Sequence, residues 1–153
     1  MKMAKIKNYM GRDFSKERAK DKLSKKKRSN LMSKIRSKNT KFETEFIDKL
    51  RKNTRKKFRV HVRKIRGTPD IVFDKYRVCV FLDSDFWHGW QYPRWKHLLK
   101  NDFWREKIEK NRARDRRNTA FLRRKGWRVL RFWEHQLKND YDWAIAKVLK
   151  ALE

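Results

Sequence analysis

The sequence contains very little cysteine. Cys79 is the only cysteine in 153 residues, and it lies in an apolar segment. A single cysteine excludes a disulfide framework within the chain, and it also excludes a zinc site built on several thiolates. We therefore expect a protein of a reducing compartment.

Long apolar runs are missing as well. No stretch of about 18 apolar residues is present, so we expect no segment that spans a bilayer. The N-terminal residues lack the apolar core of a signal peptide. The sequence also shows no internal repeat and no glycine-rich phosphate loop.

Negative charge is scarce. Asp and Glu number 18 against 46 Lys and Arg, which gives a formal net charge of +28. A surface shaped by solubility alone would mix both signs. The excess therefore predicts a polyanionic partner, and nucleic acid is favoured over an acidic membrane surface. Aromatic residues make up 14% of the chain, and rings between basic residues suit stacking on bases. We expect a cytoplasmic, DNA-associated protein.

The chain divides by composition into two regions. Residues 1–38 hold 15 basic residues against three acidic ones and are interpreted as a basic N-terminal arm. Residues 39–153 alternate between periodic segments. These predict helices at 39–52, 101–125 and 141–152, strands at 58–62, 71–73, 78–82 and 127–133, and a loop at 89–100. This order predicts one α/β domain with a small mixed β-sheet flanked by helices.

The segment 67–88, GTPDIVFDKYRVCVFLDSDFWH, places polar side chains at strand ends. A turn at residues 74–75 predicts a hairpin in which Asp70 lies beside Val80 and Phe81, near the end that carries Asp83. Carboxylates and the backbone carbonyls around Leu82 are oxygen ligands of the kind that Mg²⁺ prefers. The alternative is that both aspartates are solvated residues at strand ends.

Two further carboxylates lie on the apolar faces of predicted helices. Glu43 lies three, four and seven residues before Phe46, Ile47 and Leu50 of an apolar helical stripe, although it also fits a capping box with Thr40. Asp115 falls on the same stripe of the long helix as Ile108 and Leu122, and an inward carboxylate is a candidate site residue. The alternative is an ion pair with one of the neighbouring arginines.

Several blocks of the sequence together resemble the very-short-patch-repair (Vsr) mismatch endonucleases. The similarity runs from about Arg28 to His135 and is carried by RSNLMSKIRSKNTKFE, GTPDIVFDKYRVCVF, FWHG, DFWREKIEKNRARDRR and GWRVLRFWE. The chain is also similar to the Vsr-type homing endonucleases. The resemblance implies a restriction-endonuclease-like α/β fold that nicks double-stranded DNA by Mg²⁺-dependent phosphodiester hydrolysis, with T·G mismatches as a candidate target.

The resemblance assigns polar site residues by position. Asp70 matches the metal-binding aspartate, and Leu82 the position whose backbone carbonyl helps to bind metal. Glu43 matches the helix glutamate, which would hold metal-bound waters or a second metal position. His88 matches the histidine after Phe-Trp, a general acid or base with a pKa near neutrality. Asp115 matches the aspartate of the long helix and would orient His88.

The resemblance also assigns DNA contacts. Phe86, Trp87 and Trp104 match aromatic residues that intercalate beside a T·G mismatch, and Met32 matches an N-terminal residue that enters the duplex from the other groove. In addition, we expect phosphate contacts from the arginines of the long helix, Arg112, Arg114, Arg116 and Arg117.

The sequence departs from the family where relatives hold a structural zinc. Asp85 and Trp90 stand at ligand positions of that site, and His135 stands near another, so we expect that the structural zinc is absent. Asp83 stands where some relatives carry a catalytic histidine. Its role is left open between a metal ligand and a partner of His88.

Other functions fit part of the pattern. A homing-type or phage-type nickase of the same superfamily would read a longer sequence. A non-catalytic nucleic-acid-binding protein, or a ribosome-associated basic protein, explains the charge but not the carboxylates on inward faces. We expect the protein to be a monomer.

Overall fold

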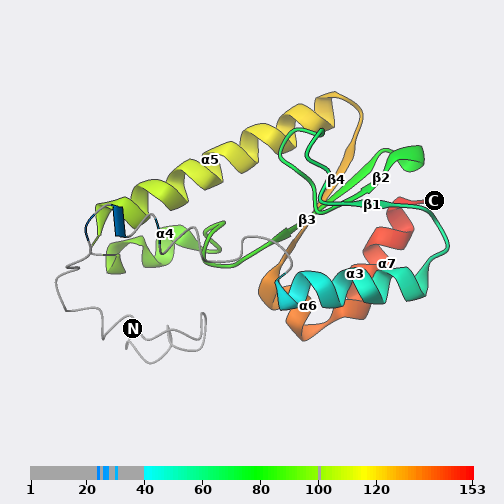
Figure 1. The fold of residues 1–153 in the computed structure, drawn as a ribbon, viewed down its shortest axis with the longest axis horizontal. Helices are drawn as coiled ribbons and strands as arrows, with labels where there is room; N and C mark the ends of the chain where they lie inside the picture. Colours follow the sequence, from blue (N-terminus) through cyan, green and yellow to red (C-terminus); the bar gives the residue numbers. More distant parts are fainter. Residues whose placement is uncertain (1–23, 25, 28–29, 31–39, 100) are drawn as a thin grey trace. The chain divides into compact units, whose positions relative to one another are not determined.

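The computed structural model describes residues 24, 26–27, 30, 40–99 and 101–153. The chain divides into two units, Met1–Thr40 and Lys41–Glu153, and the sheet and helices α3 to α7 belong to the second unit (Figure 1). Met32 lies outside the described residues, so its role stays a prediction.

The second unit contains the predicted helices and strands in the predicted order, together with further short helices. Its elements are α3 (Lys41–Asn53), β1 (Arg59–Val60), β2 (Ile71–Phe73), the 3₁₀ helix η2 (Asp74–Tyr76), β3 (Val78–Asp83), α4 (Tyr92–Trp95), the 3₁₀ helix η3 (Lys96–Leu98), α5 (Asp102–Arg124), β4 (Arg128–Trp133), α6 (Glu134–Asn139) and α7 (Tyr141–Ala151).

The four strands form one mixed sheet in the order β1-β2-β3-β4. β1, β2 and β3 pair antiparallel, and β4 pairs parallel to β3 after the crossover through α5. In the β2–β3 hairpin Ile71 lies opposite Val80, and the Asp70 N–H donates to the Val80 carbonyl, so Asp70 lies beside Val80 and Phe81 as the turn position predicts. The expected small mixed sheet flanked by helices is confirmed.

Helices cover both faces of this sheet, as Figure 1 shows, because its strands are apolar on both sides. On one face α3, α6 and α7 enclose a core around Phe46, Val80 and Phe132. On the other face, which α5 covers, Cys79, Phe81 and Leu122 pack together. Burial raises the pKa of the Cys79 thiol to about 12, so this cysteine is an inert core residue.

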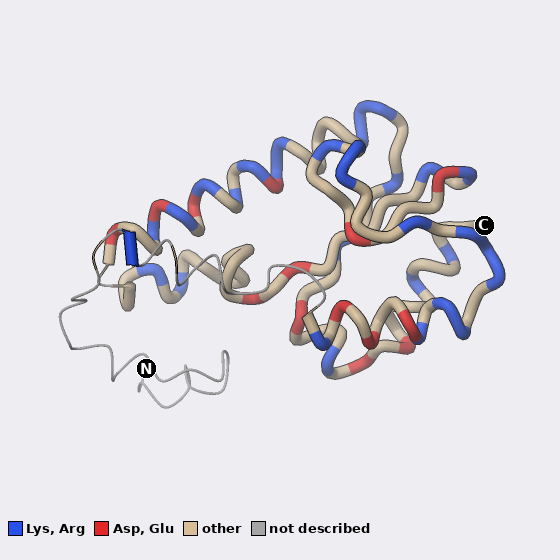
Figure 2. Tube along the Cα trace, viewed as in Figure 1, with Lys and Arg blue, Asp and Glu red and all other residues tan. Residues whose placement is uncertain are grey.

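α5 is a 23-residue helix with clear end signals. The side chain of Asn101 accepts a hydrogen bond from the Phe103 amide at 2.9 Å, which caps the N-terminus. Gly126 follows the helix at φ +79°, the left-handed conformation that glycine adopts at a helix end. Lys and Arg follow most of its length (Figure 2). No helix among the described residues is long and apolar enough to cross a membrane.

Two local predictions were wrong, and one helix was missed. β1 is shorter than residues 58–62 because His61 adopts φ +50°, which ends the extended conformation. The predicted loop at 89–100 contains α4 and η3, and Pro93 in the first turn of α4 favours that helical start. The short helix α6, directly after β4, was not predicted.

Candidate active site

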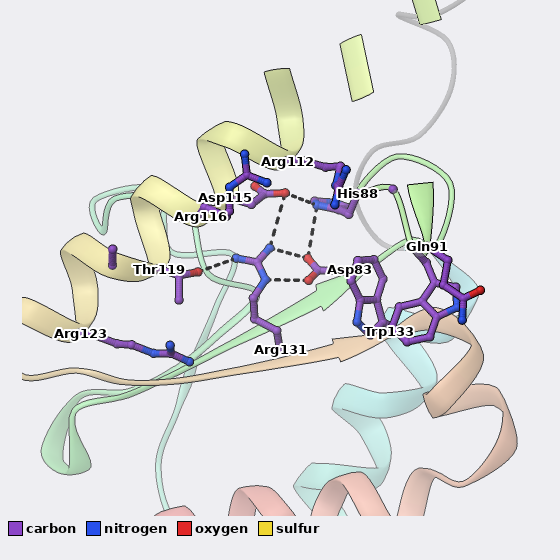
Figure 3. A pocket seen from close by; sticks show the side chains of 13 residues that line it. Asp83, His88, Gln91, Arg112, Asp115, Arg116, Thr119, Arg123, Arg131 and Trp133 are labelled. Atoms are coloured by element: carbon purple, nitrogen blue, oxygen red, sulfur yellow. Dashed lines mark hydrogen bonds and ion pairs between the residues drawn. The ribbon is translucent and has the colours of Figure 1, made fainter. Parts of the chain in front are cut away.

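The loop after β3 carries His88 to the surface of α5. Backbone hydrogen bonds fold this loop tightly, including Trp90 N–H to the Asp85 carbonyl at 2.8 Å. His88 Nδ1 lies 2.7 Å from Asp115 Oδ2, and Figure 3 shows this pair beside Asp83 and Arg131. The structure therefore brings together residues of the loop and the long helix that are 27 positions apart in the sequence.

Gly89 allows the loop to lie against α5. It adopts φ +72°, and a Cβ at this position would lie 2.7 Å from Arg112 Cδ and 2.9 Å from Ile108 Cγ2. Any larger residue would push the loop away from the helix. A second anchor is the side-chain amide of Asn111, which donates to the Trp87 carbonyl at 3.1 Å.

Arg131 of β4 connects the parts of this site. Its Nε and Nη2 donate to the two carboxylate oxygens of Asp83 at 2.7 and 2.6 Å, and its Nη1 donates to Thr119 Oγ1 at 3.1 Å. Nη2 also lies 3.8 Å from Asp115 Oδ2. Asp83 is only 2% exposed, and its Oδ1 is 3.4 Å from His88 Nδ1. Asp83 therefore lies between Arg131 and His88.

Sequence reasoning missed Arg131. The available signal was a charged residue in the middle of the apolar strand segment WRVLRFW. Its partner could not be identified, because the register that places Arg131 beside Phe81, two residues from Asp83, exists only once β3 and β4 pair.

Asp70 lies at the start of β2, where the sheet brings it against β3. Its backbone N–H donates to the Val80 carbonyl at 3.0 Å, and its Oδ2 accepts from the Leu82 N–H at 2.8 Å. His61, which sequence reasoning did not select, has Nδ1 3.8 Å from Asp70 Oδ1. Glu43 lies in the first turn of α3 and is 6% exposed.

Burial is the largest cause of the raised pKa of Asp70, and neighbouring carboxylates add to it. Burial, together with the negative charges of Glu43 and Asp83, raises the pKa of Asp70 to about 7, although the Leu82 N–H and His88 act in the opposite direction. These charges act on Asp70 only because the fold brings Glu43, Asp83 and His88 close to it.

The His88–Asp115 pair favours the charged form of both groups. Burial opposes protonation of His88, but the hydrogen bond to Asp115 and the charges of Asp83 and Asp115 outweigh it and raise the pKa of His88. Burial likewise opposes ionisation of Asp115, yet His88, Arg131 and Arg114 lower the pKa of its carboxyl group. The imidazole therefore holds its proton more firmly than a free histidine does.

The donor set around Asp70 fits a hard divalent cation. Within the described part of the chain no group of three or more His, Cys, Asp and Glu side chains has the geometry to hold a metal ion. The carboxylates of Asp70 and Glu43, with the Leu82 carbonyl, offer fewer ligands than a closed site needs. Mg²⁺ commonly keeps water and substrate phosphate as ligands, so an incomplete set of protein oxygen donors is compatible with it.

The three predicted wedge residues form one aromatic cluster. The ring centroids of Trp87 and Trp104 are 5.5 Å apart, and Phe86 lies 4.8 Å from Trp87 and 6.4 Å from Trp104. All three side chains are half-buried. Phe86 also stacks on the buried Trp95 at 5.8 Å, so the cluster packs against the core of the protein.

Asp85, Trp90 and His135, which the resemblance places at or near zinc-ligand positions, contact one another. His135 Nδ1 lies 2.7 Å from Asp85 Oδ1. The Trp90 ring lies 4.6 Å from the His135 ring and 5.0 Å from the Trp133 ring. These contacts join the loop that carries His88 to the start of α6.

The four predicted arginine contacts occupy different surroundings on α5. Arg112 and Arg116 line a cavity of about 540 Å³ beside His88. The guanidinium of Arg114 lies 3.5 Å from Asp115. Arg117 is exposed and does not line that cavity.

Comparisons with known proteins decide the family. The family model of the DNA mismatch endonuclease Vsr matches residues 20–94. The type II nicking enzyme V.XorIIP of Xanthomonas oryzae pv. oryzae is 42% identical over 121 residues, which are 78% of this chain and 88% of that protein. The chain belongs to the Vsr family.

Other relatives agree with this assignment. The type II nicking enzyme V.NmeDIP of Neisseria meningitidis serogroup C is 36% identical over 134 residues, which are 86% of this chain and 90% of that protein. The DNA mismatch endonuclease Vsr of Escherichia coli K12 is 42% identical over 83 residues, 54% of this chain and 53% of that protein. The predicted resemblance is confirmed, and this Vsr-family protein is a DNA endonuclease, a hydrolase of phosphodiester bonds.

We predict that Arg131→Met destabilises this Vsr-family protein by about 3–5 kcal/mol, because it leaves the Asp83 carboxylate buried without its partner. Urea unfolding at pH 8 followed by tryptophan fluorescence measures the change. The double variant Asp83→Asn/Arg131→Met should recover part of the loss, and Arg128→Met, an exposed position on the same strand, should change little. Equal losses for the single and double variants would contradict the assignment.

We predict that Asp70→Asn stabilises the metal-free protein at pH 8 but not at pH 4. Folded Asp70 holds its proton up to about pH 7, against an ordinary value of 3.8. The folded state therefore binds more protons between these values, and stability falls as pH rises through this window. The difference corresponds to at most about 4 kcal/mol.

Urea unfolding in EDTA at both pH values measures this effect. Asp74→Asn is the matched control on the same hairpin, because Asp74 is exposed and its pKa is lowered through the hydrogen bond with Arg59. A gain for Asp70→Asn that is equal at pH 4 and pH 8 would show that buried charge is not its cause.

Proposed function

We propose that the enzyme nicks one strand of double-stranded DNA in a Mg²⁺-dependent reaction and that its target is the T·G mismatch. The observation that carries the proposal is the arrangement at the end of β3, where Asp70 accepts from the Leu82 N–H and the His88–Asp115 pair lies beside the next residue, Asp83. A proton-transfer group and an oxygen-donor site at one strand edge are the two parts that phosphodiester hydrolysis requires.

Asp70, Glu43 and the Leu82 carbonyl are the proposed metal ligands. The Leu82 N–H already points to Asp70. In an extended strand, the N–H and C=O of one residue face the same neighbour, so the carbonyl is directed to the same edge. Mg²⁺ at this edge would supply positive charge to the scissile phosphate. Since the protein offers few ligands, binding should be weak without DNA and tighter once a phosphate joins.

His88 is the proposed proton-transfer group. Its raised pKa favours the protonated form near neutral pH, which suits a general acid that donates to the leaving oxygen. Asp115 is a positioning residue, because its 2.7 Å contact with Nδ1 fixes the ring and stabilises the imidazolium. Asp83 adds a second carboxylate at 3.4 Å but is itself held by Arg131.

Mismatch selectivity is assigned to the cluster of Phe86, Trp87 and Trp104. Apolar wedges inserted at a base step must unstack it, and the cost is lowest where pairing is already weak. The ammonium group of Lys107 lies 5.5 Å from the Trp87 ring centre, so a phosphate contact is available beside the wedge. A relative from Escherichia coli carries the name DNA mismatch endonuclease, which supports the same target.

A nicking assay tests the proposal. A labelled duplex with one T·G mismatch and its matched twin are incubated with the protein in Mg²⁺ or in EDTA. We expect a Mg²⁺-dependent nick beside the mismatch that is lost in Asp70→Ala and retained in Asp74→Ala. Cutting that persists in EDTA would overturn the metal assignment. Equal nicking of both duplexes would overturn the mismatch target and favour a sequence-specific nickase.

The pH profile tests the roles of His88 and Asp115. Asp115→Asn removes a contact that raises the pKa of His88, so the falling alkaline limb of the single-turnover rate should move toward acid pH. The rate at pH 8 should then drop, because a smaller fraction of His88 carries the proton there. Asp102→Asn, an exposed position on the same helix, is the control. An unmoved limb would remove His88 as the general acid.

A further inference from the structure

A cavity lies between α5, the loop after β3 and β4, on the side of His88 shown in Figure 3. Its volume is about 540 Å³, within the range of about 300–1,000 Å³ that is typical of ligand sites. His88 and Asp115 line it, and so do Arg116 and Arg123 of α5. The cavity therefore begins at the proposed proton-transfer pair and continues along the helix.

The α5 wall of the cavity is one stripe of the helix. Arg112, Arg116, Thr119 and Arg123 line it, and their spacing of four, three and four residues keeps them on one face. At about 1.5 Å per residue, the stripe from residue 112 to residue 123 is about 16 Å long. A wall of that length can contact more than one phosphate of a DNA strand.

The acids of the cavity are paired with basic groups, whereas two arginines of its α5 wall are not paired within the part of the chain that the structure describes. Asp83 and Asp115, the two acids of the cavity, already contact Arg131 and His88. By contrast, among the described residues no hydrogen bond or ion pair engages the guanidinium of Arg116 or Arg123, and both side chains are exposed. Arg112 rests over the Tyr92 ring at 5.3 Å. Two guanidinium groups thus remain available to an anion.

We propose that this cavity binds a sugar–phosphate segment of the DNA strand on one side of the cut. Arg116 holds the phosphate nearer to the cleaved bond, and Arg123 holds one farther away. The order of the two phosphates follows from the positions on the helix, because His88 lies at the Arg112 end of the stripe and Arg123 lies at the opposite end. The proposal rests on the proposed nicking of double-stranded DNA and adds Arg123 as a binding residue.

The experiment measures binding to a mismatched duplex in EDTA, so that no cutting occurs, over a range of salt concentrations. Arg123→Gln should raise Kd about three- to tenfold at low salt and reduce the slope of log K against log salt by about 1. Arg124→Gln is the matched control, because Arg124 is also exposed in the last turn of α5 but does not line the cavity. It should leave both values unchanged.

Neutral methylphosphonate linkages, introduced one at a time on each side of the nick position, locate the contacts. We expect one linkage at which wild type and Arg123→Gln bind equally well, because the contact is already lost. Arg116→Gln should couple to a linkage on the same side that lies closer to the nick. Equal effects of Arg123→Gln and Arg124→Gln, or no linkage that couples to either cavity arginine, would overturn the proposal.

Two measurements distinguish failure of the cavity proposal from failure of the proposed function and from misfolding of a variant. Nicking of the same duplex by wild type in Mg²⁺ tests the proposed function independently. If wild type nicks the duplex but Arg123→Gln binds it as tightly as wild type does, the binding role of the cavity is overturned and the proposed function is not. Thermal unfolding should give the same Tm for Arg123→Gln and Arg124→Gln, since no hydrogen bond or ion pair within the described part of the chain engages either guanidinium.

Discussion

The buried fork between Arg131 and Asp83 is the interaction on which the site depends. It holds the last residue of β3 against β4, with both carboxylate oxygens within 2.7 Å of guanidinium nitrogens. The same arginine reaches Thr119 of α5, and its guanidinium lies 4.5 Å from the Phe81 ring. A buried ion pair adds little net stability, but each partner is costly without the other. The fork therefore fixes where β3 ends and where the loop with His88 begins.

Charge is distributed unevenly around this fork. The chain carries a net charge of +28, yet Glu43, Asp70 and Asp83 are close enough together for their charges to raise the pKa of Asp70. A positive surface attracts the DNA polyanion from a distance, whereas a local group of acids favours a cation at the point of reaction. His88 and Arg131 limit the mutual repulsion of these acids.

Local sequence patterns predicted much of the fold and several placements within the site. The turn at residues 74–75 predicted the pairing of β2 with β3, and helical periodicity placed Asp115 on the inner face of α5, where it meets His88. The patterns failed for α4 and α6, which are too short for a clear period. They also failed for Arg131 and His61, because a strand pattern shows only which side of the sheet a residue faces and not which residue lies beside it.

The sequence alone determined the elements, the positive charge and the types of side chain available to the site, because periodicity, capping and composition act over a few neighbouring residues. The resemblance of the motifs to the Vsr family was likewise readable from the residues. Only the tertiary structure decided that Arg131 binds Asp83 and that His135 contacts Asp85, contacts that join residues 48 and 50 positions apart. Such contacts depend on the parallel register of β3 and β4 and on the packing of the loop against its neighbours, and no local pattern encodes those distances.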